Sequence, residues 1–416
     1  MKISDIKPQV YELAEKVQAS YAHVFAAIDS VAEINTRKVM TAFQDMRVSD
    51  SCFAGTTGYG YDDLGRDVLD KIYAQIFGTE AALVRIGFVN GTHALTTAMF
   101  ALASPGETVL AVTGTPYDTL RSAIGIEGNC FGSLKFYGIN YGEVALTADG
   151  EPDYEAIKKA AADKNVRGIM IQRSRGYADR KALTVDEIGR ICSCVREVNP
   201  EANIMVDNCY GEFTDTVEPT QVGADIIAGS LIKNPGGGLA PTGGYIAGKA
   251  ELVERAAMRM TSPGIGGECG STLGNNRLLF QGLFMAPHVV AQALKTAVFC
   301  SGMMKELGIE SSPAPEEKRS DIIQMVKLGS AENMKRFCLG IQAGAPVDSY
   351  VTPEAWEMPG YNCPVIMAAG SFVQGSSIEL SADGPMREPF IAYMQGGLTY
   401  ESGKLGIMMA VSAMLS

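Results

Sequence analysis

The chain has 416 residues, of which 46% are hydrophobic, and its formal net charge is −12. This length exceeds the roughly 250–300 residues of a single hydrophobic core and predicts two domains, while the acidic balance disfavours binding to nucleic acid or to an anionic membrane. Nine scattered cysteines without a CxxC pair and three distant histidines predict neither disulfides nor a metal site.

The first 60 residues predict a helical segment that ends in a glycine-rich loop. Apolar spacing favours helices to about residue 45, and Gly55-Thr-Thr-Gly-Tyr-Gly-Tyr follows, before an amphipathic helix over about 62–77. No apolar leader stands at the N-terminus, and no run of about 18 uncharged apolar residues occurs. We therefore expect a cytoplasmic protein without a membrane span.

Short apolar segments alternate with helical patterns through the middle of the chain. Strands are predicted at 82–86, 108–112, 134–137, 168–172, 203–207, 226–228 and 244–247. This alternation is typical of an α/β fold with a mainly parallel sheet. We assign residues 61–285 to this large domain and residues 286–416, where the pattern is less regular, to a smaller C-terminal α+β domain.

Two polar residues follow apolar strands of the predicted sheet. Asp207 ends the segment Asn203-Ile-Met-Val-Asp, where a carboxylate faces the ligand crevice of a parallel sheet or only caps the next turn. Lys233 closely follows the strand predicted at 226–228 and is flanked by Ser230 and by three glycines. A lysine in an apolar segment is costly to bury unless its nitrogen is paired or bound covalently to an aldehyde; the alternative is a surface lysine before a turn.

Two further segments lie at the same edge of the sheet. Gly91 and Thr92 begin a helix directly after a strand, and the free N–H groups there suit a phosphate, although Thr92 is also a good N-cap. Tyr117 follows the next strand, where its ring could stack on a flat cofactor or simply pack on the surface.

The order of these elements resembles that of fold-type I pyridoxal-phosphate (PLP) enzymes. Four segments are similar to the methionine gamma-lyase-like family, also called carbon–sulfur lyases or aluminium-resistance proteins: Val206-Asp-Asn-Cys-Tyr-Gly-Glu-Phe, Ser230-Leu-Ile-Lys-Asn-Pro-Gly-Gly-Gly, Gly243-Gly-Tyr-Ile-Ala-Gly and Thr261-Ser-Pro-Gly-Ile-Gly-Gly-Glu. The resemblance runs over nearly the whole chain, from Tyr59 to Pro389.

This resemblance implies a set of catalytic and cofactor-binding residues. Lys233 would carry PLP and shuttle protons, Asp207 would pair with the pyridine nitrogen, and Tyr117 would stack on the ring and serve, with Lys233, as a candidate proton donor. The phosphate would be received by Gly91, Thr92 and Ser230.

The resemblance also implies a homodimer or homotetramer with shared active sites. Related enzymes send a tyrosine into the partner's phosphate site from the position of Tyr59 and Tyr61, although their Tyr-x-Arg pattern is absent here and a flexible turn is the alternative. For the α-carboxylate of an amino-acid substrate we expect a bidentate arginine, first Arg387, with Arg173 and Arg175 as alternatives.

The expected reaction is β- or γ-elimination on a sulfur amino acid, of the cystathionine beta-lyase or methionine gamma-lyase type. The alternatives are an aminotransferase or another fold-type I amino-acid enzyme, and a metal-tolerance protein that binds PLP without turnover. A dinucleotide-dependent oxidoreductase is disfavoured because the sequence contains no GxGxxG motif.

Overall fold

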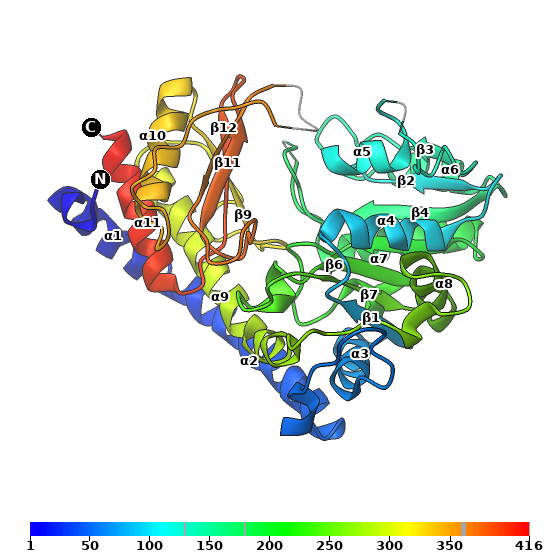
Figure 1. Cartoon of the computed structure of the whole chain (residues 1–416). Coiled ribbons are helices and arrows are strands. Elements are labelled where there is room, and N and C mark those ends of the chain that lie inside the picture. The colour runs from blue at the N-terminus through cyan, green and yellow to red at the C-terminus, as the bar shows by residue number, and fades with distance from the viewer. Residues whose placement is uncertain (129, 179, 359–362, 416) are drawn as a thin grey trace.

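The computed structural model describes residues 1–128, 130–178, 180–358 and 363–415 and contains two β-sheets (Figure 1). The larger sheet has seven strands in the order β1-β7-β6-β5-β4-β2-β3, and all run in one direction except β7. The strands are β1 (Ala81–Arg85), β2 (Thr108–Ala111), β3 (Asn140–Glu143), β4 (Val166–Gln172), β5 (Asn203–Asp207), β6 (Ile226–Ser230) and β7 (Gly244–Gly248).

Helices cover both faces of this sheet, which explains its continuous apolar strands. Strand residues that alternate along the chain enter two separate hydrophobic clusters, one shared with α4, α5 and α8 and the other with α3, α6 and α7. The helices are α3 (Leu64–Phe77), α4 (Gly91–Leu102), α5 (Asp118–Ile124), α6 (Tyr154–Ala161), α7 (Val185–Val198) and α8 (Ala250–Met260).

Six of the seven predicted strands are confirmed, and the strand predicted at 134–137 is wrong. That segment forms turns, in which the Tyr137 N–H donates to the Ser133 carbonyl, and the edge strand β3 begins at Asn140. Leu134 is buried, whereas Phe136 and Tyr137 are exposed and pack edge to face, with ring centroids 5.2 Å apart. A small aromatic surface cluster therefore produced the apolar pattern of a strand.

The second sheet is antiparallel and lies beside the first, in the C-terminal part of the chain. Its strand order is β10-β11-β12-β9-β8. Its strands are β8 (Ser311–Ser312), β9 (Ile323–Lys327), β10 (Val365–Ala369), β11 (Ser381–Pro385) and β12 (Ile391–Gln395). Two helices belong to this part of the chain: α10 (Ala331–Ala343), between β9 and β10, and α11 (Tyr400–Met414), after β12. The predicted α/β architecture, a large mainly parallel sheet with a smaller α+β part, is confirmed.

The long helix α9 (Asn276–Glu306) links the two sheets. It is long and apolar enough to cross a membrane, with a mean hydropathy of 1.4, but 78% of that stretch is buried inside the protein, as in a core helix. The predicted domain boundary at 285/286 falls within α9, and the proposed domain limits stay predictions.

The N-terminal helices extend along the molecule and pack against later elements (Figure 1). Helix α1 (Pro8–Ser20) places Val10, Ala14 and Val17 in the same hydrophobic cluster as residues of α9, α10 and α11. Helix α2 (Ala22–Asp45) contributes Val39 and Ala42 to the core of the large sheet. Short 3-10 helices complete the fold: Ile3–Asp5, Asp50–Phe53, Pro219–Val222, Asn234–Gly236 and Gly266–Glu268.

Candidate active site

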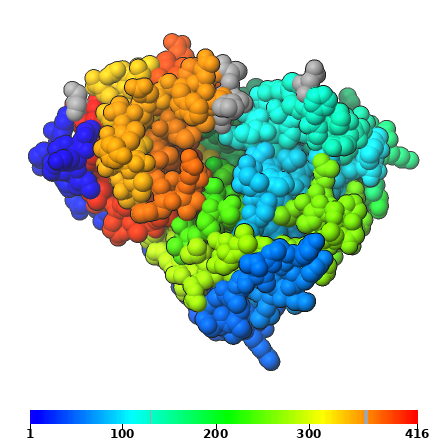
Figure 2. Space-filling model, viewed as in Figure 1, coloured from blue at the N-terminus to red at the C-terminus, as the bar shows by residue number. Residues whose placement is uncertain are grey.

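A cavity of about 590 Å³ lies between the carboxyl ends of the large-sheet strands and one face of the small sheet. Figure 2 shows the surface notched between the same two parts of the molecule. Six residues predicted from the sequence line this cavity together: Gly91, Thr92, Tyr117, Asp207, Ser230 and Lys233. A depression of about 650 Å³ between α3 and α8 contains none of them.

Lys233 reaches the cavity from the turn after β6. Its Nζ lies 3.9 Å from the centroid of the Tyr210 ring. Burial opposes the charge on this amine, but Cys209, Tyr210 and Asp207 around it outweigh burial and hold the pKa of Lys233 above its ordinary value. The amine is thus held against an aromatic ring, within the electrostatic reach of a carboxylate.

Asp207 is the last residue of β5 and is 6% exposed. The Cys209 N–H donates to its Oδ1 at 3.1 Å. Burial raises the pKa of Asp207, although Lys233 and the Cys209 N–H partly oppose this. A buried carboxylate of this kind is stabilised in its charged form by a cationic partner, and a protonated pyridine nitrogen supplies one.

The start of α4 and the end of β6 together present groups that suit an anion. Asn90 is the N-cap of α4, and its Oδ1 accepts from the His93 N–H at 2.8 Å, so Thr92 is not the cap. The hydroxyl of Ser230 is buried without a hydrogen-bond partner and lies 3.8 Å from the point that a Cβ on Gly91 would occupy. Helix N–H groups, a missing side chain and an unpaired hydroxyl fit a phosphate group.

Tyr117 is positioned by its backbone and by a neighbouring ring. Its N–H donates to Gln172 Oε1 at 2.8 Å, and its ring meets that of Tyr177 edge to face, with centroids 6.2 Å apart. A Cβ at Gly176, where φ is +57°, would lie 3.2 Å from the Tyr117 ring, so glycine leaves space for it. Stacking of Tyr117 on a cofactor ring stays a prediction.

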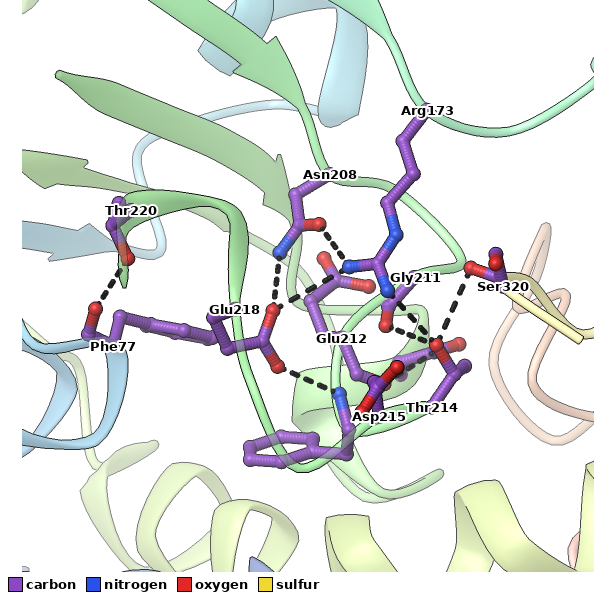
Figure 3. Close-up of polar contacts among 12 residues, drawn as sticks. Phe77, Arg173, Asn208, Gly211, Glu212, Thr214, Asp215, Glu218, Thr220 and Ser320 are labelled. Atoms are coloured by element: carbon purple, nitrogen blue, oxygen red, sulfur yellow. Dashed lines mark hydrogen bonds and ion pairs between the residues drawn. The ribbon is translucent and has the colours of Figure 1, made fainter. Parts of the chain in front are cut away.

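Arg173 lines neither this cavity nor the one beside it, which contradicts its predicted contact with the carboxylate of a substrate. Its guanidinium is fully buried, donating to Asn208 Oδ1 at 2.7 Å and to the Thr214 hydroxyl at 3.1 Å, and it pairs with Glu218 at 3.5 Å (Figure 3). This side chain leaves the strand end toward the interior, where it neutralises a buried carboxylate.

Arg175 and Arg387 line an adjoining cavity of about 290 Å³. This second cavity shares Tyr117, Gln172 and Tyr177 with the first. Arg175 is buried, donates through Nη2 to Ser312 at 3.3 Å and has a buried Nε without a partner, whereas Arg387 is exposed. Both stay candidates for the substrate carboxylate.

The loop that carries Tyr59 and Tyr61 lies outside the cavity of its own chain. The two side chains are 73% and 56% exposed, with ring centroids 5.6 Å apart. The buried Arg66 guanidinium donates to the carbonyls of Gly60 and Gly270 beneath them. These bonds, with the Gly270 N–H that donates to the Tyr59 carbonyl, fix the backbone of the loop, so the two aromatic side chains project from a well-defined surface.

Several cavity residues were missed from the sequence. Tyr210 lies within the motif that contains Asp207, and its position after that strand end was the one available signal. Tyr177, Asp383, Tyr393 and Gln395 also line the cavity, and the last three come from β11 and β12 of the second sheet. No spacing in the sequence reports that this sheet faces Lys233.

The sequence pattern of the methionine gamma-lyase family matches residues 10–415. The chain belongs to the methionine gamma-lyase family. It is 49% identical over 403 residues to an uncharacterized Bacillus subtilis (strain 168) protein, YnbB, a match that covers 97% of this chain and 96% of that one.

Solved structures place this family member among proteins of the fold-type I class. A Clostridium acetobutylicum protein, provisionally named a cystathionine beta-lyase involved in aluminum resistance, superposes with a TM-score of 0.95 and 51% identity, covering 98% of this chain and 96% of that one. The PLP-dependent protein YhfS from Escherichia coli shares the fold, with a TM-score of 0.62 and 17% identity over 92% of this chain and 95% of that one. Membership in the family implies PLP as the cofactor.

Proposed function

We propose that the protein is a PLP-dependent carbon–sulfur lyase that releases a thiol from a sulfur amino acid by β- or γ-elimination. The observation that carries this proposal is the meeting of Lys233, Asp207, Gly91 and the unpaired Ser230 hydroxyl in one cavity. These groups fit the aldehyde, the pyridine nitrogen and the phosphate of PLP. When bound, PLP supplies an electron sink for negative charge at the substrate Cα.

The chain's own residues would transfer the protons and hold the substrate. The Lys233 amine would take the proton from Cα, and Asp207 would keep a proton on the pyridine nitrogen. As the carbon–sulfur bond breaks, Tyr117 or Lys233 would return a proton to the departing sulfur. Arg387 or Arg175 would hold the α-carboxylate of the substrate. We also propose that the reaction takes place in the cytoplasm.

The reaction type is tested by the products from L-cystathionine, L-cysteine and L-methionine. We expect at least one of them to yield a thiol or hydrogen sulfide, ammonia and a 2-oxo acid in equal amounts, with Lys233→Ala as the inactive control. An amino-group exchange with an added 2-oxo acid and no ammonia would support an aminotransferase instead. Bound PLP with no turnover of any of these would support a metal-tolerance role without catalysis.

We further propose that each active site is completed by the loop of a partner subunit. Tyr59 and Tyr61 are exposed and their rings stack, and Arg66 donates to the carbonyl of Gly60 between them. Neither tyrosine lines the cavity of its own chain. In a dimer, their hydroxyls could donate to the phosphate held at the start of α4.

Reassembled hybrid dimers test this arrangement. Tyr59→Phe or Tyr61→Phe should weaken PLP binding about tenfold or more, since a hydrogen bond to a charged group contributes about 1.5–3 kcal/mol. Tyr350→Phe, at an 85% exposed tyrosine, is the matched control. Unfolding and reassembling the weakened variant with Lys233→Ala should restore activity, because one of the two hybrid sites combines the unchanged lysine of one chain with the unchanged tyrosine of the other. Verified hybrid dimers that recover no activity, or a monomer with full activity, would overturn the proposal that the subunits share active sites.

A further inference from the structure

The wall of the cavity that comes from the small sheet contains a buried carboxylate, Asp383. This residue lies on β11, is 8% exposed and lines the same cavity as Lys233 and Asp207. It therefore faces the space beside the cofactor site from the sheet opposite the lysine. None of the roles assigned above uses it.

One oxygen of this carboxylate is held by a neighbouring donor. Gln395 Nε2 donates to Asp383 Oδ2 at 3.3 Å, and the side chain of Tyr177 lowers the pKa of the carboxylate. Tyr177 is held in turn by Tyr393, whose hydroxyl donates to the Tyr177 carbonyl at 2.9 Å and whose ring centroid lies 5.1 Å from that of Tyr177. These contacts fix the direction of the carboxylate.

The other oxygen, Asp383 Oδ1, is buried and has no hydrogen-bond partner. Burial raises the pKa of Asp383 to about 6, and the donors from Tyr177 and Gln395 only partly oppose it. An acceptor left unpaired in such a place is costly unless a ligand satisfies it. A donor that enters the cavity, above all a charged one, would remove this cost.

The charges around the cavity indicate what kind of ligand this is. Among the described residues that line it, Lys233 is the one lysine or arginine, and the carboxylates are Asp207 and Asp383. Lys233 lowers the pKa of both carboxylates, but the pyridine nitrogen would pair with Asp207, so Asp383 is the carboxylate left without a cation of its own once PLP is bound. The α-amino group of a substrate must lie at Lys233, which leaves a second amino group as the partner for Asp383.

We propose that Asp383 binds an ammonium group at the far end of the substrate, so that the preferred substrates are sulfur amino acids whose departing thiol carries a second amino group. This specificity rests on the proposed lyase function. Asp383 is a substrate-binding residue here, while Gln395 and Tyr177 are positioning residues that orient it. The ligand class is thus an amino acid that is cationic at both ends of a thioether.

Two thioethers of equal length test the proposal. S-(2-aminoethyl)-L-cysteine ends in an ammonium where S-propyl-L-cysteine ends in a methyl group. We expect kcat/KM to be at least about tenfold higher for the amine, as for a hydrogen bond to a charged group. Asp383→Asn should remove most of that preference, because it raises KM for the amine much more than KM for the propyl compound. Asp186→Asn, at an exposed carboxylate on α7, is the charge-matched control.

A binding measurement separates this proposal from the lyase reaction itself. The affinity of each thioether is read from the change in the visible absorption of the PLP-loaded protein, with no turnover required. Tighter binding of the amine that is lost in Asp383→Asn supports the proposal even if no product forms, in which case the lyase function alone fails. Equal binding of the two compounds by the unmodified protein, or an equal loss for both in Asp383→Asn, would overturn it, and the first of these needs no stable variant.

Discussion

Replacing Lys233 by alanine is expected to reduce elimination about 10⁴-fold or more and to abolish the visible absorption of the PLP-loaded protein. The change removes the covalent attachment and also the general base, and general acid–base catalysis alone commonly contributes about 10²–10⁴-fold. Because Lys233 lies over the Tyr210 ring within a cavity, its loss should leave the fold intact.

Steady-state product formation and the absorption spectrum measure this effect. Lys335→Ala, at an exposed lysine on α10, is the control and should retain both properties. Turnover by Lys233→Ala within tenfold of the unmodified protein would contradict the assignment. The absorption spectrum of the PLP-free protein serves as the reference. A thermal unfolding curve of Lys233→Ala shows whether activity is lost through the chemistry or through unfolding.

Replacing Asp207 by asparagine is expected to lower kcat on the order of 100-fold or more while part of the PLP is retained. Asparagine has nearly the same shape but no charge, so the pyridine nitrogen loses the anion that keeps it protonated. The groups proposed to hold the phosphate, at the start of α4 and at Ser230, are unchanged in this variant, so cofactor binding should weaken less than catalysis.

Kinetics at saturating PLP separate these two effects for Asp207. We expect the deficit in kcat to persist when PLP is added in excess, and Asp207→Ala to behave in the same way. Full recovery with added PLP would show that Asp207 serves binding alone. Turnover near that of the unmodified protein would remove Asp207 from the catalytic set.

The large sheet and its ligand edge could be predicted because their signals are local. Continuous apolar strands followed by Asp207, or closely by Lys233, place polar groups at one edge whatever the rest of the chain does. The Leu134–Tyr137 segment shows the limit, since apolar residues that gather in turns have the same composition as a short edge strand.

Other parts of the site depend on contacts between distant segments. Arg173 follows a strand just as Asp207 ends one, but its guanidinium forms an ion pair with the buried Glu218. The spacing of these two residues in the sequence does not predict that pair. Asp383 reaches the cavity because the second sheet closes over the first, which requires the whole fold. The contact proposed for Tyr59 and Tyr61 involves a second chain, so it cannot be derived from the pattern of one chain.

Borohydride reduction of the PLP-loaded protein shows which lysine carries the cofactor. Reduction makes the cofactor–lysine bond permanent, so that digestion and peptide mass spectrometry locate it. We predict a single pyridoxyl-phosphate-modified peptide that contains Lys233, with the label absent from Lys233→Ala. Modification at a different lysine, or a protein that binds no PLP when supplied with it, would contradict the account.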